Sequence, residues 1–372
     1  MRHLFFIAVV VFLLASCTVT EPLLIYQGIP EGSPLPAPVY AYQEKSFSYY
    51  NYIVNFIGTT SRITLTNREK TRVIDYLTQQ DIHTFLADPY ETLYFSETDE
   101  AGKLFVQAGP DGADVWDLVT GKRVHSFKPA RYFNIDTRLS PNGKVLYFDH
   151  RLWDMTTAEQ IKMDLGDDLI RRSAAFSADG RYFALGGRPG TQWFDLQTKQ
   201  GEWLFAEIDT SDIQFGRDKR LYRSYGRSAA DADGIRRREI TVSRLDDNKT
   251  RATFTAPARI VCWVMLPNQQ QFVALADRTL LWFDEDLNMK QQWRSELEVK
   301  ACLPDTHNRI WLGTDKRGLL RLNLEQGLLK QVLPYTHRIE SVKLSPDENY
   351  LGLVLAPRDI SRVEIYNTAD LQ

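Results

Sequence analysis

A repeat of about forty residues constrains this 372-residue chain more than any other feature. Each copy has a turn rich in Pro, Asp, Asn or Gly, a short apolar strand, a second turn, and a strand that ends in an aromatic and a polar residue. The clearest copy covers Phe176–Leu185 and Gln192–Lys199, and its neighbour covers Leu139–Phe148 and Leu152–Thr157. We count eight such units, two of them degenerate, at spacings of roughly 37 to 52 residues.

The strand content of these units predicts the fold class. No long stretch of the chain keeps the apolar period of a helix, so we expect an all-β protein. Short strands grouped in units of this length specify a single β-propeller built from four-stranded antiparallel blades. We place it at residues 39–372, and the repeat count favours eight blades over seven.

The residue pairs that close several units carry a resemblance to known families. Trp116-Asp117 and Trp153-Asp154 end their strands, and Ser140-Pro141-Asn142-Gly143 is the kind of turn that precedes them. Together these motifs resemble the WD repeat and the related bacterial YVTN-type propellers, over roughly residues 45 to 370. The Gly-His dipeptide of eukaryotic WD repeats is missing, so the resemblance implies an architecture and no partner. We expect each tryptophan to wedge between blades and each aspartate to accept turn amides.

The last repeat stops one strand short. It ends at Val363–Tyr366, the third strand of its unit, and an open edge of this kind invites unwanted pairing. We therefore expect an amino-terminal strand to complete the blade. If Leu23–Gln27 supplies it there are eight blades, and if part of Tyr49–Tyr76 is consumed in closure there are seven. The aromatic run Tyr40–Tyr52 is expected to pack the first blade against the last, with contact to a sugar or a partner as the alternative.

The amino terminus predicts the compartment. Met1-Arg2-His3 precedes an apolar run, Leu4–Leu14, which is too short to cross a hydrocarbon core of about 30 Å. With the following Leu14-Ala15-Ser16-Cys17, this order predicts a signal peptide over residues 1–16. It also resembles the bacterial lipobox, which implies that Cys17 is lipidated. Because Thr18 rather than Asp follows, the resemblance implies the periplasmic face of the outer membrane. Residues 17–38 are expected to form an extended tether.

Charge argues against nucleic acid as a partner. The chain has 45 Lys and Arg against 48 Asp and Glu, a net charge of −3. The stretch from Ile213 to Arg244 departs from this balance, with nine basic and four acidic residues. It predicts either a surface for an anionic partner or a charged hairpin that keeps an edge soluble. The candidate interaction residues are Arg223, Arg227, Arg236, Arg237 and Arg238.

No motif in the sequence predicts catalysis, a cofactor or a metal. The six histidines have no metal-ligand or catalytic spacing. Asp231–Gly234 resembles the start of a calcium loop, but Val242 stands where a glutamate would complete the shell. Cys262 and Cys302 lie one repeat apart. Measured from the prolines that follow them, they are offset by up to three residues, which indicates two buried thiols, with a disulfide as the alternative.

These observations together predict an envelope lipoprotein that works by binding. We expect a non-catalytic scaffold or recognition module whose partner is another envelope protein, with no bound cofactor. The alternatives are a periplasmic propeller enzyme or a binder of a small glycan, each using the central channel. The sequence predicts no oligomeric state.

Overall fold

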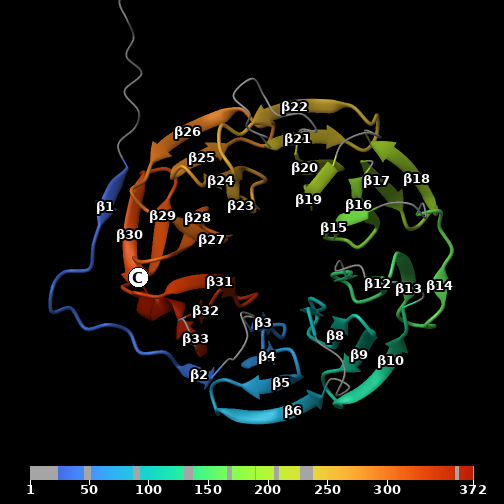
Figure 1. The fold of residues 1–372 in the computed structure, drawn as a ribbon, viewed down its shortest axis with the longest axis horizontal. Coiled ribbons are helices and arrows are strands. Elements are labelled where there is room, and N and C mark those ends of the chain that lie inside the picture. Colours follow the sequence, from blue (N-terminus) through green and yellow to red (C-terminus); the bar gives the residue numbers. More distant parts are fainter. Residues whose placement is uncertain are drawn as a thin grey trace, which may run out of the picture.

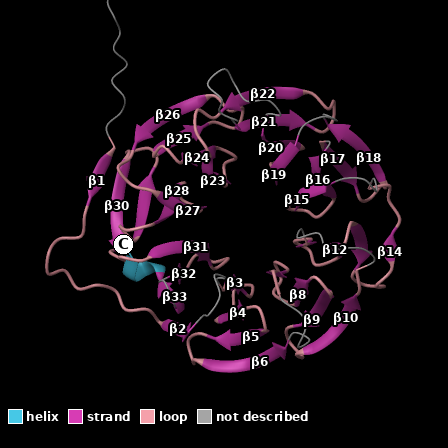
Figure 2. Cartoon of the chain, viewed as in Figure 1, coloured by secondary structure: helices cyan, strands magenta, loops and turns pink. Residues whose placement is uncertain are grey.

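The computed structural model describes residues 24–45, 52–86, 93–129, 137–165, 170–188, 190–204, 209–226, 238–356 and 360–371. Their strands form eight separate sheets that stand as blades around a central axis (Figure 1). Within these ranges the only helix is the short 3₁₀ turn η1 (Thr368–Leu371), and no helix is long and apolar enough to cross a lipid bilayer (Figure 2). The predicted all-β, eight-bladed propeller is confirmed.

Each blade has its first strand nearest the axis and its later strands successively further out (Figure 1). Blades 1 and 2 contain β3 (Ile53–Phe56), β4 (Arg62–Thr66), β5 (Lys70–Asp75), β6 (Gln80–Leu86), β7 (Phe95–Thr98), β8 (Leu104–Gly109), β9 (Gly112–Asp117) and β10 (Lys122–Phe127). Blades 3 and 4 contain β11 (Arg138–Leu139), β12 (Val145–Phe148), β13 (Arg151–Asp154), β14 (Gln160–Ile161), β15 (Ile170–Phe176), β16 (Tyr182–Arg188), β17 (Thr191–Asp195) and β18 (Gln200–Leu204).

The second half of the ring repeats this plan. Blades 5 and 6 contain β19 (Asp209–Phe215), β20 (Arg220–Gly226), β21 (Arg238–Arg244), β22 (Thr250–Thr255), β23 (Ile260–Met265), β24 (Gln271–Leu275), β25 (Thr279–Phe283) and β26 (Met289–Arg294). Blades 7 and 8 contain β27 (Val299–Pro304), β28 (Arg309–Thr314), β29 (Leu319–Asn323), β30 (Leu328–Leu333), β31 (Arg338–Leu344), β32 (Tyr350–Ala356) and β33 (Ile360–Asn367).

An amino-terminal strand completes blade 8, as the sequence predicted, but it is not Leu23–Gln27. The outer strand is β2 (Tyr40–Lys45), which pairs antiparallel with β33. β1 (Ile25–Gln27) instead pairs parallel with β30 and adds a fifth strand to blade 7. The difference follows from burial, since Tyr40 is 6% exposed whereas all of β1 is exposed. Blade 1 keeps all four of its own strands, so the seven-blade alternative is wrong.

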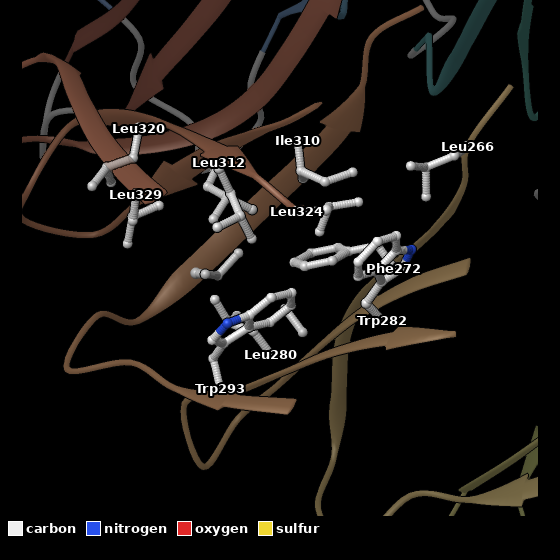
Figure 3. Packing of buried hydrophobic residues seen from close by; sticks show 13 residues of the cluster. Leu266, Phe272, Leu280, Trp282, Trp293, Ile310, Leu312, Leu320, Leu324 and Leu329 are labelled. Carbon is white, nitrogen blue, oxygen red and sulfur yellow. The ribbon is translucent and has the colours of Figure 1, made fainter. Parts of the chain in front are cut away.

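Apolar layers shared by neighbouring blades hold the ring together. Figure 3 shows the layer between blades 6 and 7, in which Trp293, Phe272 and Leu320 are each 0% exposed. Trp282 and Trp293 stack there with ring centroids 6.4 Å apart. Full burial of one such side chain contributes about 1.5–3 kcal/mol, so each blade is stable chiefly through its neighbours.

The tryptophans of the Trp-Asp pairs lie between blades, as predicted. Trp116 of blade 2 stacks on Phe85 of blade 1, with centroids 4.4 Å apart and the ring planes 15° from parallel. Trp153 of blade 3 packs against Phe127 of blade 2 at 4.8 Å. These rings fill the space between the outer strands of successive blades.

The aspartates of the same pairs cap the turns that follow. Asp117 Oδ1 accepts hydrogen bonds from the amides of Val119 and Thr120 at 2.9 and 2.8 Å, and Asp154 Oδ1 accepts one from Thr156 at 2.7 Å. A short carboxylate can satisfy these amides without leaving its own strand, which is why an Asp recurs at this place. The predicted structural role of the Trp-Asp pairs is confirmed.

Candidate functional site

A cavity of about 440 Å³ lies against the first strands of blades 5 to 8. Figure 1 shows these strands on the inner side of the ring. Strands β19, β23, β27 and β31 supply most of its lining. The polar residues that face it are Asp212, Ser224, Arg238, Lys300, Glu340, Ser341 and Lys343. The lining carries both acidic and basic side chains, which suits a polar ligand better than an apolar one.

Lys343 is the most perturbed charged group of this channel. Desolvation by the surrounding wall lowers the pKa of its ammonium, although the side chain is accessible to water within the channel. Glu97 of blade 2 opposes the shift and Arg138 of blade 3 adds to it. These two residues belong to first strands of other blades, so the pKa of Lys343 depends on charges that other blades bring to the channel.

Two other channel residues, Lys300 and Glu340, each pair with a side chain two positions earlier in the sequence. Lys300 bonds to Glu298, and Arg338 Nε bonds to Glu340 Oε1 at 2.7 Å. Arg238, in contrast, makes no ion pair with any described residue, and its side chain is exposed. The channel therefore offers Arg238 and Lys343 as cations for a ligand or partner.

A disulfide joins Cys262 and Cys302 in the wall of this cavity, with their Cα atoms 6.1 Å apart. The predicted pair of buried thiols is therefore wrong. Both first strands have a bulge near their start, and Cys262 is the first paired residue after it whereas Cys302 is the second. The true offset is one residue, which a disulfide tolerates. The offset counted from the prolines is too large because the two prolines are not equivalent positions. Pro304 is the last residue of β27, while Pro267 lies beyond β23.

The predicted basic surface is only partly described. Arg227, Arg236 and Arg237 lie outside the described residues, as does the candidate calcium segment Asp231–Gly234. Arg238 begins β21 and faces the channel cavity. Arg223, in contrast, is 2% exposed and sits inside blade 5, so it does not belong to an exposed interaction surface. The structure does not bring Arg223 and Arg238 to one face.

Other cations of this segment are used in ion pairs. Arg220 bonds to Glu285 at 2.9 Å and lies 3.4 Å from Asp286, both in the last hairpin of blade 6. Arg244 bonds to Asp246 at 3.1 Å. These pairs tie blade 5 to blade 6 and close a turn, which leaves fewer cations for a partner than the sequence count indicates.

The aromatic run at the start of the chain packs across the closure, as favoured from the sequence. Tyr40 and Tyr52 are buried in one cluster with residues of blades 1 and 8, and Tyr42 packs against it. The rings of Tyr42 and Tyr52 meet edge-on, with centroids 5.7 Å apart. Phe47, Tyr49 and Tyr50 lie outside the described residues.

A buried acid in blade 8 was not singled out by the sequence. Glu364 is 0% exposed and bonds to Arg362, to the hydroxyl of Tyr335 and to that of Tyr366, the last at 2.6 Å. Burial raises the pKa of both phenols. Alternation along β33 places Arg362, Glu364 and Tyr366 on one face. This spacing is visible in the sequence and could have predicted that the three side chains lie together. The group is a structural network that fixes β33.

Among the described residues no group of three His, Cys, Asp or Glu side chains is arranged to hold a metal ion. The eight sheets and the cavity on their inner strands define the class of this protein: an all-β, eight-bladed β-propeller with a polar central cavity.

Comparisons with known proteins agree with this class. The Dos1 propeller superposes with a TM-score of 0.68 at 12% identity, over 90% of this chain and 95% of that one. No family model matches the sequence, and no curated protein matches it. Altogether 1353 chains of solved structures match, so the fold alone selects no function.

Proposed function

We propose that this protein is a lipid-anchored scaffold of a bacterial envelope, which binds another envelope protein through its propeller and catalyses no reaction. The closed ring carries the proposal, because eight blades locked by β2 hold their connecting loops in fixed positions. The WD-like and YVTN-like character of the repeats belongs to the same proposal. So do the signal peptide at residues 1–16, the lipid on Cys17 and a location at the periplasmic face of the outer membrane.

The position of β1 supports a short link between lipid and propeller. Ile25 lies eight residues after Cys17, and its amide donates to the carbonyl of Gly327 at 2.9 Å. Eight residues span at most about 30 Å when fully extended. This is about half the reach expected of a tether that extends to residue 38, so the outer edge of blade 7 would lie close to the lipid surface.

Exposed apolar side chains lie along the same part of the chain. Ile25 is 51% exposed, Tyr26 is 44% exposed and Leu35 is 54% exposed. Tyr26 also donates its hydroxyl to Gln331 Oε1 at 3.1 Å, so its ring is held at the blade edge. Such residues suit the boundary between lipid and water or the surface of a membrane protein.

The partner is expected to offer acidic groups to the channel mouth. Arg238 follows directly after Arg236 and Arg237 in the sequence, and it faces the channel cavity. The test is in-cell crosslinking of the full-length chain, affinity purification and mass spectrometry of what co-purifies. We expect one defined envelope protein in stoichiometric amount. Reversal of Arg236, Arg237 and Arg238 to Glu should weaken its recovery.

Anchoring is tested separately from partner binding. Growth with a radiolabelled or alkyne-tagged fatty acid should label the wild-type chain and leave Cys17→Ser unlabelled. If the wild-type protein takes up no label, the anchor is refuted. If it is labelled but purifies alone with two different crosslinkers, the scaffold is refuted while the anchor stands.

The channel cavity favours a second candidate, binding of a small glycan. Its volume of about 440 Å³ and mixed polar lining suit a sugar-sized ligand. A saturable rise in Tm with peptidoglycan fragments, lost in Lys343→Met, would support this function over the scaffold. An enzyme acting in the channel would in addition convert such a ligand, which product analysis by mass spectrometry would reveal.

A further inference from the structure

The five blades from 4 to 8 can be aligned residue by residue, because each has a bulge near the start of its first strand. The second paired residue after the bulge faces one particular residue of the second strand. In blades 4, 6, 7 and 8 that residue is a buried aliphatic side chain, respectively Leu185, Val273, Leu312 and Leu353.

Blade 5 has Arg223 at this position. It pairs with Ile213 on one side and with Thr241 on the other, and it is 2% exposed, as deeply buried as the aliphatic residues it replaces. Desolvation lowers the pKa of its guanidinium to about 10. A buried charge costs several kcal/mol in place of a well-packed aliphatic side chain, so blade 5 would be no less stable with an aliphatic residue here.

A cavity of about 510 Å³ opens directly onto this arginine. Antiparallel pairing places Arg223, Thr241 and Thr253 in one cross-strand row, and directly paired residues lie on the same face of a sheet. The remaining residues around the cavity are Tyr225, Asn248, Lys249 and Thr250.

The cavity runs from a buried floor to an exposed rim. Arg223 and Thr241 form the floor, each 2% exposed, while Lys249 and Thr253 at the rim are exposed. One guanidinium nitrogen of Arg223 donates to Ser243 Oγ at 3.0 Å. Thr241 Oγ1 is buried and has no hydrogen-bond partner among the described residues. A buried hydroxyl left in this state costs free energy, and a ligand in the cavity would satisfy it.

We propose that this cavity of blade 5 binds the anionic group of a small hydroxylated ligand, a sugar acid or a sugar phosphate. The guanidinium of Arg223 supplies charge and several donors in one plane, which suits a carboxylate or a phosphate. The hydroxyls of Thr241, Thr250 and Thr253 and the amide of Asn248 suit the hydroxyl groups of a sugar. The volume is ample for a monosaccharide.

Two acidic side chains close to the cavity already have partners. Glu239 accepts from Tyr225 Oη at 2.5 Å and from Thr255 Oγ1 at 3.3 Å. Glu202 of blade 4 bonds to the side-chain amide of Asn248. Neither acid lines the cavity, whereas both Arg223 and Lys249 do. The cations, not the acids, therefore face a bound ligand.

Titration calorimetry and thermal shifts on the mature wild-type chain test this site. The probes are glucuronate for a carboxylate, glucose 6-phosphate for a phosphate, and glucose as the neutral control. We expect saturable binding and a rise in Tm with one or both charged probes and no effect of glucose. The stronger charged probe identifies which anionic group the site prefers.

The variants separate the site from the fold. Arg223→Leu places in blade 5 the residue that blades 4, 7 and 8 have, so it should fold with an unchanged or higher Tm. It should weaken the charged probe at least about tenfold. Thr241→Val should weaken it less, and Arg223→Gln checks the result if the leucine variant is perturbed. Arg217→Leu makes the same change at an exposed position outside the cavity and is the matched control.

Loss of binding in Arg223→Leu and Arg223→Gln, with retention in Arg217→Leu, supports the proposal. Three results overturn it: no charged probe binds the wild-type chain, binding survives both Arg223 variants, or glucose binds as tightly as the charged sugars. Because none of these measurements involves Cys17 or a protein partner, they stand independently of the proposed scaffold function.

Discussion

Removing the disulfide between Cys262 and Cys302 should lower the stability of the propeller by about 4 kcal/mol. The bridge closes a loop with a sequence separation of 40 residues, and the chain-entropy model gives this value for a loop of that length. For a chain of 372 residues the entropy of unfolding is large, so the same loss corresponds to a fall in Tm of only about 5 °C.

The assay compares the oxidised chain with a double variant, Cys262→Ala and Cys302→Ala, by calorimetry. A Cys17→Ser background makes the result unambiguous, because the chain has three cysteines in total. Thiol titration of the unfolded protein should then find no free thiol before reduction and two after it. Reduction of the wild-type pair should lower Tm by about as much as the double variant does.

Two results would refute this reasoning. Free thiols in protein purified from an oxidising compartment would show that the pair is not bridged. A double variant whose Tm stays within about 1 °C of the oxidised protein would show that blades 6 and 7 gain nothing from the bridge. Cys302→Ser alone is the control, since it removes the bridge and leaves one thiol to titrate.

Three further perturbations have definite outcomes. Deletion through β2 (Tyr40–Lys45) should destabilise the ring by about 3–6 kcal/mol and expose blade 8 to limited proteolysis, because β33 loses its partner strand and the cluster between blades 1 and 8 loses the Tyr40 ring. An unchanged digest would contradict the closure. Asp195→Asn should lower Tm slightly at neutral pH, since the hydrogen bond from the Arg181 guanidinium lowers the pKa of Asp195. That difference should be present at neutral pH and vanish in Tm measurements as pH falls below the ordinary value of 3.8. Lys343→Met should raise Tm at neutral pH, because the channel wall lowers the pKa of Lys343 and disfavours its charge; the gain should shrink as pH approaches the ordinary value of 10.5.

Local signals were enough to predict the blades. Turns such as Ser140–Gly143 hold a glycine at φ 68°, a conformation that side chains disfavour, and the sequence shows this turn at the same place in successive units. Alternating apolar residues then mark the strands between turns. Blade count and fold class follow from counting these units, which requires no knowledge of which strands meet across the ring.

Contacts between distant segments were not predictable in the same way. The closing strand pairs Tyr40 with Ile365, and nothing local to either segment distinguishes β2 from β1 as the partner of β33. The disulfide depends on a bulge in each of two strands, and a bulge shifts register by one residue without a sequence signature. The sequence offered Arg223 as part of an exposed interaction surface, whereas the side chain is buried, because its burial depends on which face of β20 it occupies.

Strand register relates equivalent positions of different blades more closely than the sequence repeat does. A propeller contains several copies of one structural position, so each blade provides a reference for the others. At the position aligned on the bulge, four of the five blades have a buried aliphatic side chain, because the same packing must be satisfied there. Where one blade substitutes a charge for an aliphatic side chain, as Arg223 does for Leu185, Leu312 and Leu353, packing does not explain the residue. Such a departure persists against its cost in stability, which is the physical argument for a ligand site in blade 5.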